Sequence, residues 1–328
     1  MFGLVSEYPR NQAEFETQFG TEEACRAYLL KLRWPEGFRC PRCGRTKAWP
    51  VRNVMLECAA CGRQTSITAG TIFQDTRTPL TVWFRAMWAV TGPKTGTSAL
   101  TLWQLLGLGS YQTAWAWLHK LRRAMVRPGR ERLAGQVEVD EAFVGALEEG
   151  ATGRGAVKKV LIVVAVEYKA RKIGRIRLRR VPDGSADSLQ TFIDEVVEPR
   201  SVVHTDGWLG YDRLRAHGYR HRITFLSDHP EPASALLPRV HLVVSLLKRW
   251  LLGTHQGAVH PAHLDYYLDE FTFRFNRRRS RSRGHLFFRL AEQAVQIDPV
   301  PYKALVRQTR RGPPRGRKRR QPRRHPKM

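Results

Sequence analysis

Acidic residues, cysteines and long apolar segments are all scarce in this chain of 328 residues. Asp and Glu number 29 against 56 Lys and Arg, which gives a net charge of +27 at pH 7. Such a charge disfavours a basic partner and favours a polyanion, either nucleic acid or an anionic membrane surface. The sequence has no run of about 18 apolar residues, so no transmembrane helix is predicted. The first residues do not resemble a secretory signal, so we expect a cytoplasmic, nucleoid-associated protein.

The five cysteines are too few and too closely paired for a disulfide framework. Cys40 and Cys43 form one Cys-x-x-Cys pair, Cys58 and Cys61 form another, and a glycine follows each pair. Two thiolates from one tight turn can reach the same ion, and two such turns complete a tetrahedral site. The spacing therefore predicts structural Zn²⁺ in a zinc ribbon, in preference to free thiols or a redox pair. Cys25 stands apart and is expected to be a small core residue.

Helices are predicted on both sides of this ribbon. The first spans residues 12–33 and has an apolar face. After the ribbon, Thr78 and Pro79 are typical of a helix start, and two further helices follow, separated by glycine-containing turns. The last of these helices has basic residues near its end, namely Lys120, Arg122 and Arg123. A helix-turn-helix-like unit of this kind is typical of DNA-reading modules, and an ordinary helical bundle with solvated cations is the alternative.

The pattern changes from helices to strands after residue 132. Strands are predicted at 136–146, 159–167, 174–181 and 201–206, with a helix at 185–197 before the last strand. Asp140 and Asp206 each end an apolar, β-branched run, and carboxylates at converging strand ends can share divalent metal ions. For either residue alone, a turn or a helix cap is the alternative. This order of elements is that of an RNase H-like α/β domain, a mixed sheet with flanking helices.

Five segments together resemble bacterial insertion-sequence transposases, which carry a zinc ribbon ahead of a DDE-type catalytic domain. The segments are CPRCG at 40–44, VDEAFVG at 139–145, HTDGWLGY at 204–211, LLKRWLLGTH at 246–255 and YLDEFTFRFNRR at 267–278. The resemblance implies a DNA transposase that binds the terminal inverted repeats of its element and catalyses DNA cleavage and strand transfer. It also implies catalytic Mg²⁺ or Mn²⁺, double-stranded DNA as partner, and a homodimer or larger assembly on that DNA.

The same resemblance maps Asp140 and Asp206 onto the first two metal ligands of the catalytic site. Many such enzymes have Glu as the third ligand, and the matching position, 35 residues after Asp206, is His241. The family often has Asn or His there with a Lys after it, which implies His241 as third site residue and Lys248 as a DNA-phosphate contact. Imidazole binds Mn²⁺ or Zn²⁺ better than Mg²⁺, so proton transfer and DNA contact stay open as alternatives for His241. A helix-capping or solvated histidine is a further alternative.

Other acidic residues are candidates for the same site. Glu138 shares a strand face with Asp140 by alternation and is a candidate auxiliary ligand. Four further carboxylates compete for the third position: Asp228, Glu231, Asp265 and Asp269.

A row of charges follows at spacings of four and seven, from Glu270 through Arg274 to Arg277. This row is similar to a Glu-Arg-Arg series near the active site of the family, so Glu270 is a candidate site residue. The two arginines and Arg249 are candidate DNA contacts. A structural salt bridge within one helix is the alternative for Glu270 and Arg274.

These patterns predict five parts: an N-terminal helical segment at 1–35, the zinc ribbon at 36–68, the helix-turn-helix-like domain at 69–128, the catalytic domain at 132–297 and a tail at 303–328. The tail contains many Lys and Arg and no acidic residue, so it is predicted to be disordered. It would bind phosphates without sequence preference, or serve only to keep the protein in solution.

Two other functions stay open from the sequence. A nuclease or resolvase with an RNase H-like fold would cleave DNA without joining strands. A non-catalytic DNA-binding regulator derived from a transposase would tolerate a His at the third position, although the two Asp residues argue against it. The zinc ribbon and the basic helical unit favour the transposase.

Overall fold

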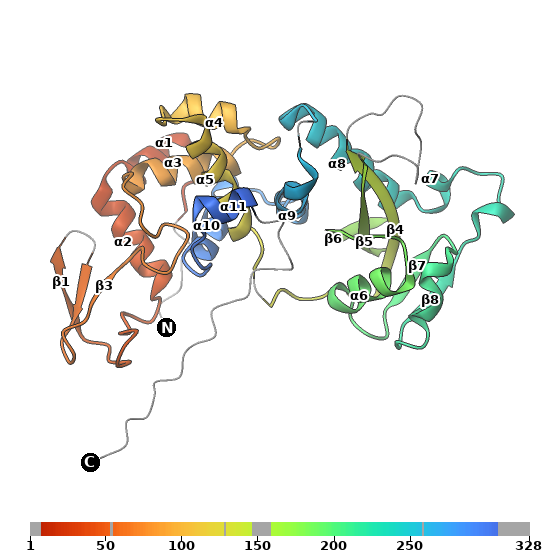
Figure 1. Cartoon of the computed structure of the whole chain (residues 1–328), viewed down its shortest axis with the longest axis horizontal. Helices are drawn as coiled ribbons and strands as arrows, with labels where there is room; N and C mark the ends of the chain where they lie inside the picture. Colours follow the sequence, from red (N-terminus) through yellow and green to blue (C-terminus); the bar gives the residue numbers. More distant parts are fainter. Residues whose placement is uncertain (1–7, 53–54, 128, 146–158, 258, 308–328) are drawn as a thin grey trace, which may run out of the picture. The chain divides into compact units, whose positions relative to one another are not determined.

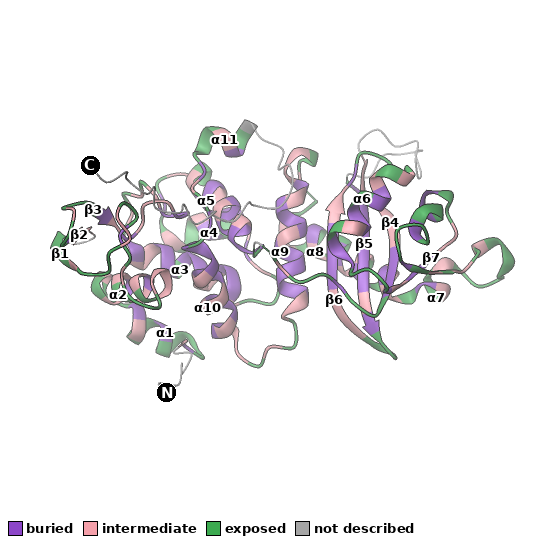
Figure 2. Ribbon diagram, turned by 90° about the horizontal axis from the view of Figure 1, so that it is seen from below, coloured by how far each residue is buried: buried purple, intermediate pink, exposed green. Residues whose placement is uncertain are grey.

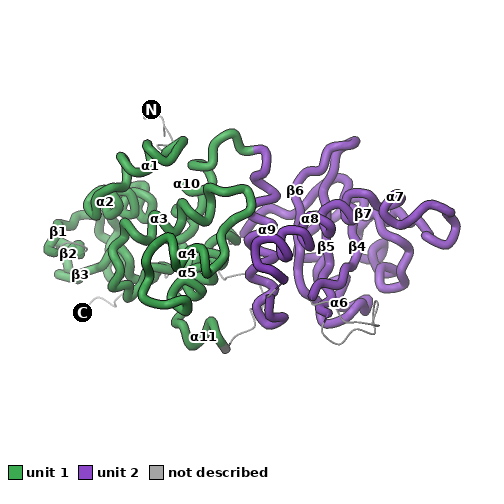
Figure 3. The backbone as a smooth tube through the Cα atoms, turned by 90° about the horizontal axis from the view of Figure 1, so that it is seen from above, with its two compact units in different colours: residues 1–128, 280–307, 312–328 green, residues 129–279, 308–311 purple. Residues whose placement is uncertain are grey.

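The computed structural model describes residues 8–52, 55–127, 129–145, 159–257 and 259–307. Among these residues the chain forms two compact units, one of residues 8–127 with 280–307 and one of residues 129–279 (Figure 3). The predicted catalytic domain extended to residue 297, whereas the second unit ends at 279. The residues of the predicted tail from 308 onward lie outside the described residues.

The first unit begins with two helices, α1 (Gln12–Phe19) and α2 (Glu22–Arg33) (Figure 1). The prediction of one continuous helix was therefore wrong. Thr21 has extended backbone angles and its hydroxyl accepts a hydrogen bond from the N–H of Ala24, so it caps a new helix. A cap of this kind starts a helix even inside a continuous apolar pattern.

A small antiparallel sheet follows these helices. It consists of β1 (Ala48–Arg52), β2 (Met55–Cys58) and β3 (Gln64–Ser66), in that order. The sheet has few buried side chains, among them Cys58 and Thr65. So little apolar burial cannot by itself offset the conformational entropy lost on folding.

The rest of the first unit is helical. After the sheet come α3 (Leu80–Thr91), α4 (Ala99–Leu106) and α5 (Tyr111–Ala124), and near the C-terminus α10 (Arg283–Ala294) and α11 (Tyr302–Arg307). The start of α3 is held by Glu22 rather than by Thr78, because the Glu22 carboxylate accepts hydrogen bonds from the N–H groups of Leu80 and Thr81.

Aromatic side chains form the core of this unit. The rings of Trp83 and Trp117 stack with centroids 3.6 Å apart, and both side chains are buried. Phe287 of α10 packs against Phe19 and Phe84, with ring centroids 5.3 and 5.7 Å away. This packing explains why α10 belongs to the first unit although it follows the second unit in the sequence.

The second unit is built on a five-stranded sheet. Its strands are β4 (Gln136–Gly145), β5 (Lys159–Lys169), β6 (Lys172–Arg180), β7 (Val202–Thr205) and β8 (Arg220–Ile223), in the spatial order β6-β5-β4-β7-β8. The strands β6, β5 and β4 are antiparallel, and β4, β7 and β8 are parallel. Four of these strands were predicted. The fifth, β8, has the polar sequence Arg-His-Arg-Ile and no apolar pattern to reveal it.

Helices cover both faces of the sheet. On one face α6 (Ala186–Val196) packs Leu189 and Phe192 against Val163. On the other face α8 (Pro238–His255) and α9 (Leu264–Asn276) pack Val243 and Phe271 against strands β5 and β6. Figure 2 shows buried stretches along the strands of the sheet and on the helices that cover it. This mixed, helix-covered sheet is consistent with an RNase H-like domain.

Short elements complete the second unit. They are α7 (Ala233–Leu236) and the 3-10 helices η2 (Leu209–Leu214), η3 (Leu226–Asp228) and η4 (Pro261–His263). Of the helices that the structure describes, none combines the length and apolar character that a membrane crossing requires.

Candidate functional site

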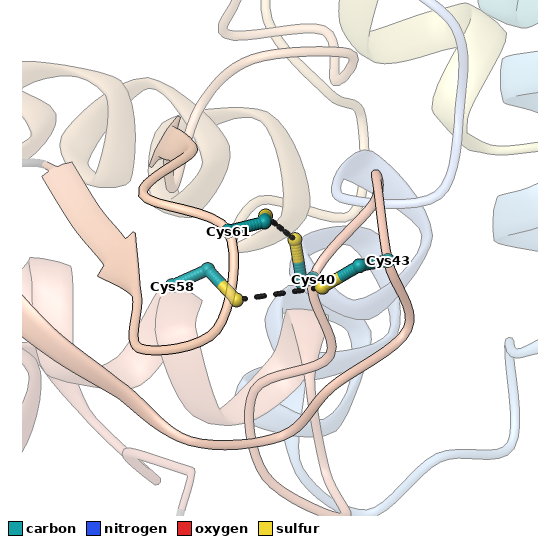
Figure 4. A group of neighbouring side chains, drawn as sticks. All are labelled: Cys40, Cys43, Cys58 and Cys61. Carbon is teal, nitrogen blue, oxygen red and sulfur yellow. Dashed lines mark hydrogen bonds between the residues drawn. The ribbon is translucent and has the colours of Figure 1, made fainter.

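The four paired cysteines of the ribbon meet at one point (Figure 4). Their sulfur atoms all lie within 4.8 Å of one another. The Cys40 and Cys61 sulfurs are 3.7 Å apart, and the Cys43 and Cys58 sulfurs are 3.6 Å apart. Four sulfurs at the usual Zn–S distance of about 2.3 Å lie about 3.8 Å apart along each tetrahedral edge. The arrangement therefore fits a tetrahedral zinc ion.

Hydrogen bonds prepare this site for a cation. The backbone N–H groups of Ala60 and Cys61 lower the pKa of the Cys58 thiol to about 7. The thiolate is the form that binds zinc, so a depressed pKa favours binding at neutral pH. The turn that supplies these N–H groups ends at Gly62, and the turn of the other cysteine pair ends at Gly44; both glycines have positive φ angles.

The candidate catalytic residues begin with Asp140 in the middle of β4. We predicted a carboxylate at a strand end, and for Asp140 this was wrong, because β4 stays paired with β5 as far as Gly145. Asp206 does follow the last residue of β7. The parallel register pairs Gln136 with Val202 and Glu138 with His204. Continued by two residues, this register brings Asp206 level with Asp140.

The turn after β7 is shaped by Gly207. Its φ angle is +86°, and a Cβ atom there would lie 2.7 Å from the ring of Phe225. Only glycine fits both conditions without strain. The Oδ1 atom of Asp206 accepts a hydrogen bond of 3.0 Å from the N–H of Trp208, which fixes the side chain on this turn.

His241 lies in the first turn of α8, beside Asp140. Its Nε2 atom is 3.7 Å from Oδ2 of Asp140. This nitrogen is buried and has no hydrogen-bond partner among the described residues. Burial lowers the pKa of His241, Asp206 raises it and Lys248 lowers it, with a net decrease. A neutral imidazole with a free buried nitrogen is the form that can bind a metal ion.

The electrostatics of Asp140 also fit a cation site. Burial, followed by the negative charges of Asp206 and Glu141, raises the pKa of Asp140 to about 7. A divalent cation would remove this repulsion. Neighbouring ligand atoms on one octahedral Mg²⁺ ion, each about 2.1 Å from it, are about 3.0 Å apart. The 3.7 Å between Oδ2 of Asp140 and Nε2 of His241 is longer than this, so both atoms would bind one ion after a small shift of the side chains.

The catalytic set is less compact than the ribbon site. Among the described residues, only the four cysteines form a group of three or more candidate ligands with every donor atom within 4.8 Å. Asp140, Asp206 and His241 therefore lie near one another, but their donor atoms are not all close enough to bind one ion in this conformation.

Two neighbours of this set were missed from the sequence. Tyr211 is fully buried, and burial together with Glu141, Asp140 and Asp206 raises its pKa well above the usual value. Arg239 forms an ion pair with Glu138, with Nη1 and Oε1 3.4 Å apart. Arg239 lies outside the segments that carry the family resemblance. Tyr211 ends the segment HTDGWLGY at 204–211, but only the fold shows that it is buried beside these carboxylates.

The predicted basic contacts differ in accessibility. On α8, Lys248 and Arg249 are exposed. Arg274 is buried and donates hydrogen bonds to Glu270, which is 0% exposed, so this pair fits the structural salt bridge. Arg277 lies over the ring of Phe273, 4.0 Å from its centroid.

On α5, Arg122 is only 1% exposed, which does not fit a direct phosphate contact. Lys120 and Arg123 are partly buried, and burial lowers the pKa of Lys120. Cys25 is 0% exposed, as expected of a core residue.

Three of the four competing carboxylates have partners of their own. Asp265 pairs with Arg180, Glu231 lies 3.8 Å from His229, and Asp228 accepts a hydrogen bond from Ser227. The acidic residues that raise the pKa of Asp140 are Asp206, Glu141 and Glu138, and none of the four competitors.

A four-cysteine ribbon and an RNase H-like sheet with gathered carboxylates define a class of protein, the transposases of mobile elements. Residues 132–276 match the ISXO2-like transposase domain, and residues 20–64 match the transposase zinc-ribbon domain. The chain belongs to this family of insertion-sequence transposases. It is also similar to a protein of Halobacterium salinarum described as an uncharacterized protein in transposable element ISH50. The two are 26% identical over 279 residues, which cover 78% of this chain and 91% of the relative. The predicted family and fold class are thereby confirmed.

Proposed function

We propose that this chain is the enzyme that cleaves the ends of an insertion sequence and joins them to target DNA. The observation that carries the proposal is the meeting of Asp140, Asp206 and His241 from β4, β7 and α8. The net charge of +27 supports a polyanionic substrate. The matches to transposase domains support DNA as that polyanion.

Two successive phosphoryl transfers would account for this activity. In the first, a water oxygen forms a bond to a phosphorus at the element end while the bond from phosphorus to the 3′ oxygen breaks, which frees a 3′ hydroxyl. In the second, this hydroxyl attacks a phosphodiester of the target, and a target 3′ hydroxyl leaves. One phosphodiester bond is formed for each one broken in the second step, so no external energy source is needed.

Asp140, Asp206 and His241 would hold Mg²⁺ or Mn²⁺ in this centre. When bound, the ions would activate the attacking oxygen and stabilise the leaving oxygen. Lys248 and Arg249, exposed on α8 beyond His241, would bind the backbone phosphates and orient the scissile bond. Burial lowers the pKa of His241, which favours the neutral imidazole, and its Nε2 atom has no hydrogen-bond partner among the described residues, which favours a ligand over a charged phosphate contact.

The first unit would recognise the element. Its zinc ribbon, held by Zn²⁺ on the four cysteines, and its helices α3 to α5 would bind the terminal inverted repeats, with Lys120 and Arg123 as phosphate contacts. Since two element ends are joined in one reaction, we expect a homodimer or a larger assembly on DNA.

A strand-joining assay tests the proposal. The purified chain is mixed with DNA that carries the flanking ends of the gene, a target plasmid, and Mg²⁺ or Mn²⁺. We expect joined products from the natural protein and none from Asp206→Asn or Asp140→Asn. Asp187→Asn is the matched control, because Asp187 lies in the same unit with a side chain 84% exposed and is expected to retain joining.

The alternative functions give different results in the same assay. Cleavage without joining in either metal would favour a nuclease or resolvase. Sequence-selective binding of the flanking ends with neither cleavage nor joining would favour a regulator. Equal activity of Asp206→Asn and the natural protein would reject the proposed site.

A further inference from the structure

Helix α8 begins without a capping side chain of its own. The residue before it, Leu237, is apolar and its side chain accepts no hydrogen bond. The first helical residue is Pro238, which has no N–H group. The N–H groups of Arg239 and Val240 therefore depend on an acceptor from elsewhere in the fold.

That acceptor is Glu138 on strand β4. Its Oε2 atom accepts a hydrogen bond of 3.0 Å from the N–H of Arg239, and the N–H group of Val240 also favours the charged form of this carboxylate. The carboxylate thus does for α8 what an N-cap side chain does for other helices, although it lies about 100 residues earlier in the chain. Its negative charge also faces the positive end of the helix dipole.

The side chain of Arg239 strengthens the same attachment. Its Nη1 atom is 3.4 Å from Oε1 of Glu138, and its Nη2 atom donates a hydrogen bond of 3.0 Å to the carbonyl of Ala170. Its guanidinium group lies over the ring of Tyr168, 3.9 Å from the centroid. The first turn of α8 is therefore fixed both to β4 and to the end of β5.

The consequence concerns the candidate catalytic site. Glu138 and Asp140 are two residues apart on β4 and so share a face, while Arg239 and His241 are two residues apart on α8. On strand β4, the carboxylate of Glu138 therefore holds the start of α8. The carboxylate of Asp140 lies 3.7 Å from Nε2 of His241 in the next part of that helix turn. We propose that Glu138 is a positioning residue that holds His241 beside Asp140, an inference that rests on the proposed function.

The same contacts argue against Glu138 as an auxiliary metal ligand. The side chain is 0% exposed, and both carboxylate oxygens are engaged by Arg239, one by its backbone and one by its guanidinium group. A ligand would need a lone pair directed at the ion and away from these donors. Glu138 contributes to the site through the helix that it anchors.

Mn²⁺ binding to the full chain, followed by electron paramagnetic resonance, tests this role. Glu138→Ala removes the cap and is expected to raise the Kd for Mn²⁺ about tenfold, the usual effect of losing a residue that orients a ligand. Glu138→Gln keeps the shape and one acceptor oxygen, so a change below about threefold is expected. The Mn²⁺ binding that is lost in Asp206→Asn is the binding that belongs to this site.

The decisive comparison is made in a His241→Ala background. If Glu138 acts through His241, Glu138→Ala changes the Mn²⁺ affinity of the natural protein but not that of His241→Ala. A merely structural role would lower the melting temperature in both backgrounds and would leave the Mn²⁺ affinity of folded protein unchanged. An equal loss of affinity in both backgrounds would overturn the inference and restore Glu138 as a ligand.

Arg239→Gln provides a second route if Glu138→Ala does not fold. It keeps the backbone hydrogen bond to Glu138 and removes the guanidinium contacts to Glu138, Ala170 and Tyr168, so a smaller rise in Kd is expected, again only when His241 is present. A proposed function that is itself wrong gives a different result, because Asp206→Asn would then leave Mn²⁺ binding of the natural protein unchanged.

Discussion

The zinc ribbon and the carboxylate site are both suited to metal ions, but they are built in opposite ways. The ribbon takes its four ligands from two turns between residues 40 and 61, and their sulfurs are already at tetrahedral spacing. The carboxylate site takes its residues from positions 140 to 241, and three separate elements of the fold bring them near one another.

The difference lies in what supports each site. The ribbon sheet has little apolar core, so its ligands need the ion to hold the turns together. The carboxylates stand on a sheet with an apolar core on each face, so this scaffold has a source of stability that does not depend on an ion. The ribbon ion would thus be structural, and under the proposed function an ion at the second site would take part in the chemistry.

Metal removal should therefore have the largest effect and should separate the two sites. We predict that strong chelation, or Cys40→Ser with Cys43→Ser, unfolds β1 to β3, since structural zinc in such sites contributes about 10 kcal/mol. The sheet of the second unit should stay folded. Hydrogen exchange checks this, with loss of protection expected in residues 48–66 and none in β4 or β5. Equal loss in both sheets would contradict the comparison.

Removal of one carboxylate should affect activity far more than folding. We predict that Asp206→Asn lowers strand joining by at least about 10²-fold, the effect of losing one group that stabilises transition-state charge. Single-turnover joining rates measure this, and thermal unfolding should show a native-like transition. A variant that loses joining only because it is unfolded would not support the account.

Replacement of the third site residue should change the metal preference. Carboxylate is a harder ligand than imidazole and suits Mg²⁺ better. We predict that His241→Glu raises the ratio of joining in Mg²⁺ to joining in Mn²⁺ by about tenfold. Ser245→Ala, on the exposed face of the same helix, is the control and should leave the ratio unchanged. An unchanged ratio in His241→Glu would mean that this position does not contact the metal.

The smallest expected effect is a gain in the stability of the metal-free protein on Asp140→Asn, and this gain depends on pH. The folded protein raises the pKa of Asp140 to about 7, so above pH 7 the charged carboxylate destabilises the metal-free fold. Since the folded state binds the proton more tightly than the unfolded state, this contribution to stability falls as the pH rises from about 4 to 7. Asp140→Asn should therefore stabilise the metal-free protein at pH 8, on the order of 1 kcal/mol, and not at pH 4. Thermal melts at both pH values check this.

The sequence was informative where the signal is local. The cysteine spacing predicts the ribbon because the ligands of each pair lie in one turn. Apolar alternation predicts four of the five strands and the helix α6, because each has a buried face. The split at Thr21 was missed because the apolar pattern runs through it, and β8 was missed because it is polar.

The sequence was less informative where the signal is tertiary. The strand predicted at 136–146 does run beyond Asp140, as β4 does, but the end of the apolar run at Asp140 wrongly suggested a carboxylate at a strand end. Arginine side chains are usually exposed, but Arg122 and Arg274 are buried, which the sequence does not show. The cap that Glu138 provides for α8 joins residues about 100 positions apart, so only the folded chain reveals it.

The central claim is that Asp140, Asp206 and His241 form one divalent-metal centre. Anomalous diffraction at the manganese edge, on crystals of the full chain soaked in Mn²⁺, tests it most directly. The account predicts a peak between Oδ2 of Asp140 and Nε2 of His241, with Asp206 turned towards it, and no such peak in Asp206→Asn crystals. A peak that contacts none of these three residues, or none at all in the second unit at saturating Mn²⁺, would contradict it.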